Sequence, residues 1–74
     1  MTYSEVGLIG RMEEALRVVK SLSKAQLDSL VYDLEREGWY CSDKRRKRAF
    51  CIDVIISNWS YDRSLITRCL YNCL

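Results

Sequence analysis

The sequence contains no histidine, no proline and only three glycines in 74 residues. Without histidine, general acid and base catalysis falls to carboxylates, and the commonest nitrogen ligand of metal ions is missing. Hydrophobic residues make up 49% of the chain, whereas a disordered chain of this size is poorer in Leu, Ile, Val and aromatic residues. These features predict a folded, non-enzymatic chain with a single domain, residues 1–74.

Long apolar runs are also missing. No run of 18 apolar residues occurs, and the first residues do not combine a basic segment with an apolar one. We therefore expect a cytoplasmic protein with no membrane partner, whose four cysteines are reduced thiols.

The charges are divided unevenly along the chain. Residues 1–43 contain five bases and eight acids, whereas residues 44–74 contain seven bases and two acids. Five of the later bases are consecutive, at Lys44–Arg48. The sequence therefore predicts an acidic face from the first half and a basic face from the second, and such a field steers association with charged partners.

The first helix is predicted at about residues 3–21. Thr2 and Glu5 have the spacing of a capping box, and apolar residues then recur at intervals of three and four. Because glycine disfavours a helix, Gly7 and Gly10 leave a start nearer Arg11 as the alternative. The apolar stripe consists of Leu8, Ile9, Met12, Ala15, Leu16, Val19 and Leu22.

The second helix, Lys24 to Glu37, has the clearest boundary signals. Ser23 is expected to cap its N-terminus together with Gln26. At the other end, Gly38 suits the left-handed residue of a Schellman motif, with Trp39 packing back on the helix. The expected buried stripe is Leu27, Leu30, Val31 and Leu34.

The basic run leads into an apolar segment that fits two structures. As a helix from Asp43 to about Asn58, capped by Ser42 or Asp43, it buries one face made of Ala49, Ile52, Ile55, Ile56 and Trp59. Phe50 and Val54 then lie on the opposite side, together with Arg46 and Lys47. As a strand, residues 49–56 pair with residues 39–41 in a short hairpin, which suits the β-branched content.

A last helix is predicted from a cap at Ser60 to the C-terminus, after a break at Asn58–Ser60. Its stripe is Leu65, Ile66, Cys69, Leu70 and Cys73. The helical interpretation is favoured, which gives an all-α bundle of three to four helices; the alternative is an α+β fold with the short hairpin.

The basic run is the candidate binding site. Clustered arginine is suited to phosphate, through bidentate charge-assisted bonds, and also to an acidic protein surface. The ordinary alternative is that arginine stems cover apolar surface while their charged ends stay in water. The predicted partner-binding or phosphate-binding residues are Lys44, Arg45, Arg46, Lys47, Arg48, Phe50 and Val54.

A short pattern joins Leu27-Asp28-Ser29-Leu30, Gly38, Lys44 and a following apolar helix. Over residues 22–58 this pattern resembles the helix-extended-helix element of SAP-type DNA-binding domains. The resemblance implies that the DNA backbone is contacted by Lys44, Arg45 and Arg46. Two features depart from the family: the expected glycine before the lysine is missing, and the turn holds the bulky side chains of Trp39 and Tyr40.

The cysteines do not have the spacing of a zinc module, since no Cys-x-x-Cys pair occurs. We expect Cys41, Cys51, Cys69 and Cys73 to be buried, and we predict no metal and no cofactor. Asp53 is the one carboxylate in an apolar setting, and its ordinary role is a solvent-facing position or an ion pair.

These observations favour a small interaction protein, an inhibitor or adaptor that docks on a larger protein or nucleoprotein complex. Compact domains of this kind are common among phage and mobile-element products, of which anti-CRISPR proteins are one example. Direct nucleic-acid binding by the SAP-like element is the alternative. Because Phe50 and Val54 require cover, a homodimer is also considered.

Overall fold

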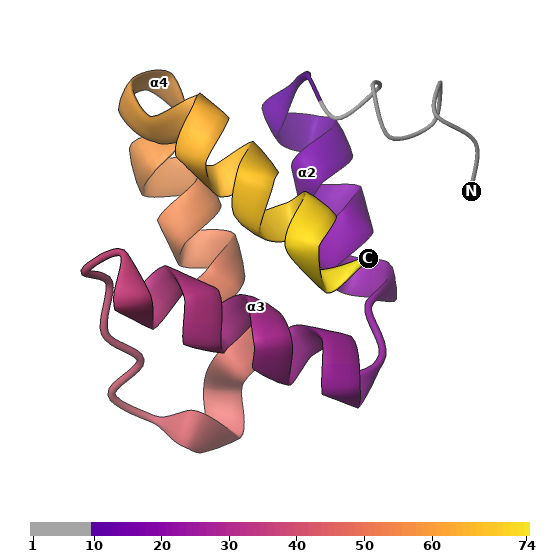
Figure 1. The fold of residues 1–74 in the computed structure, drawn as a ribbon, viewed down its shortest axis with the longest axis vertical. Coiled ribbons are helices and arrows are strands. Elements are labelled where there is room, and N and C mark those ends of the chain that lie inside the picture. The colour runs from indigo at the N-terminus through magenta and orange to yellow at the C-terminus, as the bar shows by residue number, and fades with distance from the viewer. Residues whose placement is uncertain (1–9) are drawn as a thin grey trace.

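The computed structural model describes residues 10–74 and is helical (Figure 1). It contains α2 (Met12–Ser21), α3 (Lys24–Arg36), a short 3₁₀ turn η1 (Lys44–Arg46) and α4 (Lys47–Cys73). Residues 10–74 form no strand, so the all-α prediction is confirmed. The alternative hairpin between residues 39–41 and 49–56 is wrong, because residues 49–56 lie inside α4.

Helix α2 ends at Ser21, as predicted, and begins at Met12 after an extended Arg11, so the alternative start near Arg11 is confirmed and a helix that continues through Gly10 is wrong. The backbone N–H of Arg11 donates to Glu14 Oε1 at 3.2 Å, which satisfies one of the free donors at the helix start. The earlier part of the predicted helix, with its capping box, lies outside the described residues. Within α2 and its C-cap, the residues that enter the core are Ala15, Val19 and Leu22.

Helix α3 forms as its local signals predict. Ser23 Oγ accepts from the N–H of Gln26 at 3.2 Å, and Gln26 Oε1 accepts from the N–H of Ser23 at 2.9 Å. At the other end, Gly38 has φ +113° and donates to Glu35 O at 3.1 Å. The N–H of Trp39 donates to Leu34 O at 3.1 Å, which completes the Schellman motif. All four predicted stripe residues, Leu27, Leu30, Val31 and Leu34, are buried.

Helix α4 is kinked, and the kink lies at Asp62, where φ is −124° and ψ is 26°. The predicted break at Asn58–Ser60 is therefore misplaced by a few residues. Those residues remain helical, and the Asn58 side chain donates back to Val54 O at 3.0 Å, which keeps it within the helical turn. The two halves run in different directions, and the second returns towards α2 and α3 (Figure 1).

The core is organised around α4, which packs against both α2 and α3. The first half of α4 contributes Cys51, Val54 and Ile55, and the second half contributes Ile66, Cys69, Leu70 and Cys73. The predicted stripe of the last helix is thus mostly confirmed, and so is the burial of all four cysteines. No helix within residues 10–74 has the length and hydropathy needed to cross a bilayer.

The predicted buried face of residues 49–59 is correct in part, because Ile55 is buried and Ile52 and Trp59 pack against the core, but the helix is rotated relative to the prediction. Val54 was expected at the surface, but it is 5% exposed, whereas Ile56 was expected in the core and is 54% exposed. Phe50 is half-buried and packs against the core. The polar residues give the reason: Asp53, Ser57 and Ser60 have spacings of four and three, so they share the exposed face, and burying a carboxylate costs more than exposing Ile56.

Candidate nucleic-acid interface

The basic run begins at a corner that is fixed by Asp43. Asp43 Oδ1 accepts from the N–H of Arg45 at 3.0 Å, which caps η1. This bond and the Arg45 side chain hold the pKa of the Asp43 carboxyl below its usual value. The bases therefore start at a defined turn, and the side chains that follow point to different sides of it.

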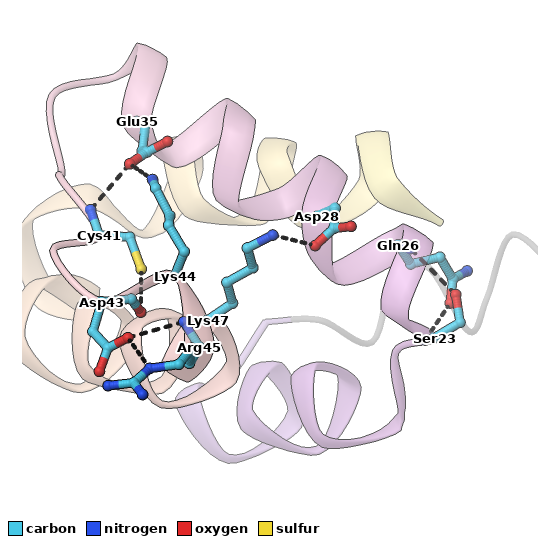
Figure 2. A network of polar contacts seen from close by, with 9 residues as sticks. All are labelled: Ser23, Gln26, Asp28, Glu35, Cys41, Asp43, Lys44, Arg45 and Lys47. Carbon is cyan, nitrogen blue, oxygen red and sulfur yellow. Dashed lines mark hydrogen bonds and ion pairs between the residues drawn. The ribbon is translucent and has the colours of Figure 1, made fainter.

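Two lysines of the run are paired with acids of α3 (Figure 2). Lys44 forms an ion pair with Glu35, and Lys47 Nζ lies 2.7 Å from Asp28 Oδ1. The hydrogen bond from Lys47 lowers the pKa of Asp28, and the hydrogen bond from Lys44 lowers the pKa of Glu35 and raises that of Lys44 itself. The first pair connects η1 to α3, and the second connects the start of α4 to α3.

Glu35 also holds the connection that leads to the basic run. Its Oε2 accepts from the backbone N–H of Cys41 at 3.1 Å, next to its contact with Lys44 (Figure 2). The Cys41 thiol in turn donates to Asp43 O at 3.3 Å. A single carboxylate therefore fixes both the extended segment and the first base after it.

Arg48 is turned into the molecule, towards the end of α2. Its guanidinium donates to Val19 O at 2.5 Å and to Leu22 O at 3.1 Å. The last carbonyls of a helix have no partner within the helix and carry partial negative charge, so a cation at this position supplies both hydrogen bonds and dipole compensation. Arg48 is thus a C-terminal cap for a helix more than twenty residues earlier in the chain.

The three inward bases come from two elements. Lys44 belongs to η1, whereas Lys47 and Arg48 are the first residues of α4, after a non-helical backbone at Arg46, and they contact Asp28 of α3 and Val19 O of α2. The expected grouping of Lys47 with Arg46 on an outer face is therefore wrong. Lys47 and Arg48 lie on the side of α4 that packs towards α2 and α3. This is the side that buries Val54, because the opposite side carries the exposed polar residues Asp53, Ser57 and Ser60.

Arg45 and Arg46 remain at the surface. The Arg45 side chain is 91% exposed and lies 3.3 Å from Asp43 through Nε. The Arg46 side chain is exposed and makes no hydrogen bond or ion pair with any residue of the described range 10–74. These two guanidiniums keep donors that face water.

A groove of about 650 Å³ runs between the start of α3 and the basic run. Six cations and one acid line it, and the acid, Asp28, is already paired with Lys47. We call it the basic groove; its lining is Lys24, Leu27, Asp28, Lys44, Arg45, Arg46, Lys47, Arg48 and Ala49.

Lys24 is the functional candidate that the sequence did not indicate. It lies twenty residues before the basic run, in the first turn of α3, and only the packing of α3 against α4 brings it to the groove. Of the predicted site residues, Lys44 to Arg48 line the groove together. Phe50 and Val54 do not line it, and Val54 belongs to the core.

Three of the buried cysteines, Cys51, Cys69 and Cys73, have raised pKa values. Burial raises the pKa of the Cys51 thiol to about 12 and that of Cys73 to about 11, and it also raises the pKa of Cys69. These thiols are therefore protonated at neutral pH and are poor nucleophiles. Asp53 is exposed, and among residues 10–74 no three Cys, Asp or Glu side chains converge as ligands of a metal ion would.

Comparison of the chain with protein-family models, curated proteins and solved structures found no match. The resemblance of residues 22–58 to SAP-type domains therefore stays a prediction.

Proposed function

We propose that this chain is a non-enzymatic interaction protein that docks on a nucleoprotein complex by contacting nucleic-acid phosphates in the basic groove. The observation that carries the proposal is the lining of the groove: six cations against one acid that is already neutralised by Lys47. Within residues 10–74, Lys24, Arg45 and Arg46 form no ion pair with α3 acids and no bond to α2 carbonyls, so they supply the available charges.

Phosphate is the counterpart that this lining suits best. Guanidinium groups form paired, charge-assisted bonds with phosphate oxygens, and Arg45 and Arg46 both have donors directed to solvent. The open groove admits a strand with repeated charges. The inward bases hold its wall in place, because their bonds to α2 and α3 fix the backbone on which the outward arginines stand.

The state of the thiols supports a binding role over a catalytic one. A nucleophilic cysteine requires a lowered pKa and a nearby base, whereas burial raises the pKa of Cys51 to about 12. The sequence has no histidine to act as that base. Docking as an inhibitor or adaptor is therefore the form of function that we propose.

The test is fluorescence anisotropy with a labelled duplex and a labelled single strand across a salt series. Binding is expected at low salt and should weaken steeply as salt rises, because each phosphate contact releases a counterion. Changing Lys24, Arg45 and Arg46 to alanine should reduce the slope of log K against log salt by roughly two to three.

The matched control changes Arg17, Lys20 and Arg36 to alanine, which removes the same charge from other exposed positions. This control should keep most of the affinity of the unchanged protein. The proposal is wrong if neither nucleic acid binds at low salt, or if the control loses as much affinity as the groove variant.

A further inference from the structure

A second hollow of about 250 Å³ opens beside the basic groove. It shares Arg46 and Ala49 with the groove, so the two hollows adjoin at the start of α4. We call it the side pocket; it is lined by Tyr40, Cys41, Ser42, Asp43, Arg46, Ala49, Phe50 and Asp53. Its volume is below the roughly 300–1,000 Å³ of sites for drug-sized ligands, which points to a smaller occupant.

Two aromatic rings contribute to the side pocket in different ways. Phe50 packs against the core, so its ring is held in place, whereas Tyr40 is 75% exposed. Lys44 Nζ lies 5.3 Å from the centroid of the Tyr40 ring and restrains it. A flat ligand can therefore stack on either ring, as unpaired bases do on aromatic side chains.

The side pocket contains the carboxylates of Asp43 and Asp53, which accept hydrogen bonds, and the guanidinium of Arg46, which donates them. Within residues 10–74, the hydrogen bonds to the Asp43 carboxylate reach Oδ1 alone, and both come from Arg45. Asp53 makes no hydrogen bond or ion pair with residues 10–74, and the Arg46 side chain makes none either, although its charge acts on Asp43 and, after the bonds from Arg45, helps to lower the pKa of that carboxyl. A fitting ligand carries donors for carboxylates next to acceptors for a guanidinium.

Guanine has this combination. Its N1–H and N2–H₂ groups are adjacent donors that match a carboxylate, and its O6 and N7 are the acceptors that arginine binds in pairs. Thymine and uracil have one ring N–H between two carbonyls, and adenine and cytosine each have a single amino group beside ring acceptors. A base can enter such a pocket only when it is unstacked, which single strands allow.

We infer that the side pocket binds one unstacked guanine of a single strand whose neighbouring phosphates lie in the basic groove. This inference rests on the proposed function and specifies its ligand. Arg46 stands where groove and pocket meet, so it faces both the base and the backbone of the strand. Asp43 and Asp53 accept from the guanine edge, while Tyr40 and Phe50 provide the stacking surface.

The test compares short labelled oligothymidines that differ at one central position, which holds thymine, guanine, adenine or hypoxanthine. The guanine strand should bind about tenfold more tightly than the thymine strand. Hypoxanthine lacks the N2 amino group and should lose most of that preference. Asp53→Asn should lose the guanine preference and keep the affinity for the all-thymine strand, whereas Tyr40→Ala should weaken every strand and the guanine strand most.

The control is Lys24→Ala, because Lys24 lines the groove but not the side pocket, and this change should weaken all four strands by the same factor. Thermal melts of each variant check the fold. Equal affinity for the four strands, with salt dependence retained, would overturn the guanine site and leave the proposed function standing. Absence of binding to every strand and to the duplex overturns both.

Discussion

The corner formed by η1 and the start of α4 has an inner and an outer side that differ in how their side chains are used. On the inner side, Lys47 and Arg48 bind α3 and α2, and Val54 enters the core. On the outer side, Arg46 and Ile56 face solvent. Neighbouring residues of the same type thus have different roles, because helical geometry sends them in different directions.

This difference changes how a run of bases is interpreted. Five consecutive cations look like one patch in the sequence, yet three of them neutralise acids or cap a helix in the structure. The remaining two, with Lys24, carry the charge available to a partner. Stability and binding are therefore expected to respond to different members of the same run.

The largest effect is expected from Val54→Asp, which places a carboxylate on the inner side. A buried charge without a partner destabilises a fold by about 3 kcal/mol or more. Ile56→Asp is the matched change on the outer side and should shift stability by about 0.5 kcal/mol or less. Urea unfolding followed by circular dichroism measures both, and equal losses would contradict the rotation of α4.

Arg48→Ala should be the most damaging change within the basic run. It leaves the carbonyls of Val19 and Leu22 without their charged donor, at a cost of about 2 kcal/mol, or a fall in melting temperature of roughly 10 °C. Arg48→Lys should recover part of the loss, since it keeps a cation but not the paired donors. If Arg48→Ala left the melting temperature unchanged, Arg48 would not stabilise the end of α2.

Acid should weaken the inner side of the corner. The folded pKa values of Asp28 and Glu35 lie below their usual 3.8 and 4.5, so their pairs contribute stability above those values. That contribution is lost as pH falls through the usual values towards the lower folded ones. The urea midpoint should therefore drop between about pH 5 and pH 3, and Asp28→Asn with Glu35→Gln should flatten this drop. An equally steep drop in the double variant would contradict a role for these pairs.

The smallest effect on stability is expected from changing Arg45 and Arg46 together to alanine. Both side chains are exposed, and the single ion pair of Arg45 with Asp43 is a surface contact, so unfolding should change by about 0.5 kcal/mol or less. The same variant should lower the salt dependence of nucleic-acid binding by roughly two contacts. A large loss of stability in the Arg45 and Arg46 double variant would contradict the conclusion that only the inner bases stabilise the fold.

The sequence by itself determined the elements whose signals are local. Ser23 with Gln26 and Gly38 with Trp39 are neighbours in the chain, so the caps of α3 could be predicted before any packing was known. The stripe of α3 and most of the stripe of residues 65–73 followed from helical spacing in the same way. The spacing of the polar residues Asp53, Ser57 and Ser60 also indicated the exposed face of α4. The prediction instead followed the spacing of the apolar residues and placed Ile56 in the core.

Only the tertiary structure decided what the basic run does. The first half of α4, which follows the basic run, is apolar on several sides. The rotation of this helix about its axis therefore depends on how α2 and α3 cover it. That rotation sends Arg48 to the end of α2 and brings Lys24 to the groove across a separation of twenty or more residues. Contacts this distant in the chain have no local pattern, because they are formed by packing between helices and not by neighbouring residues along one of them.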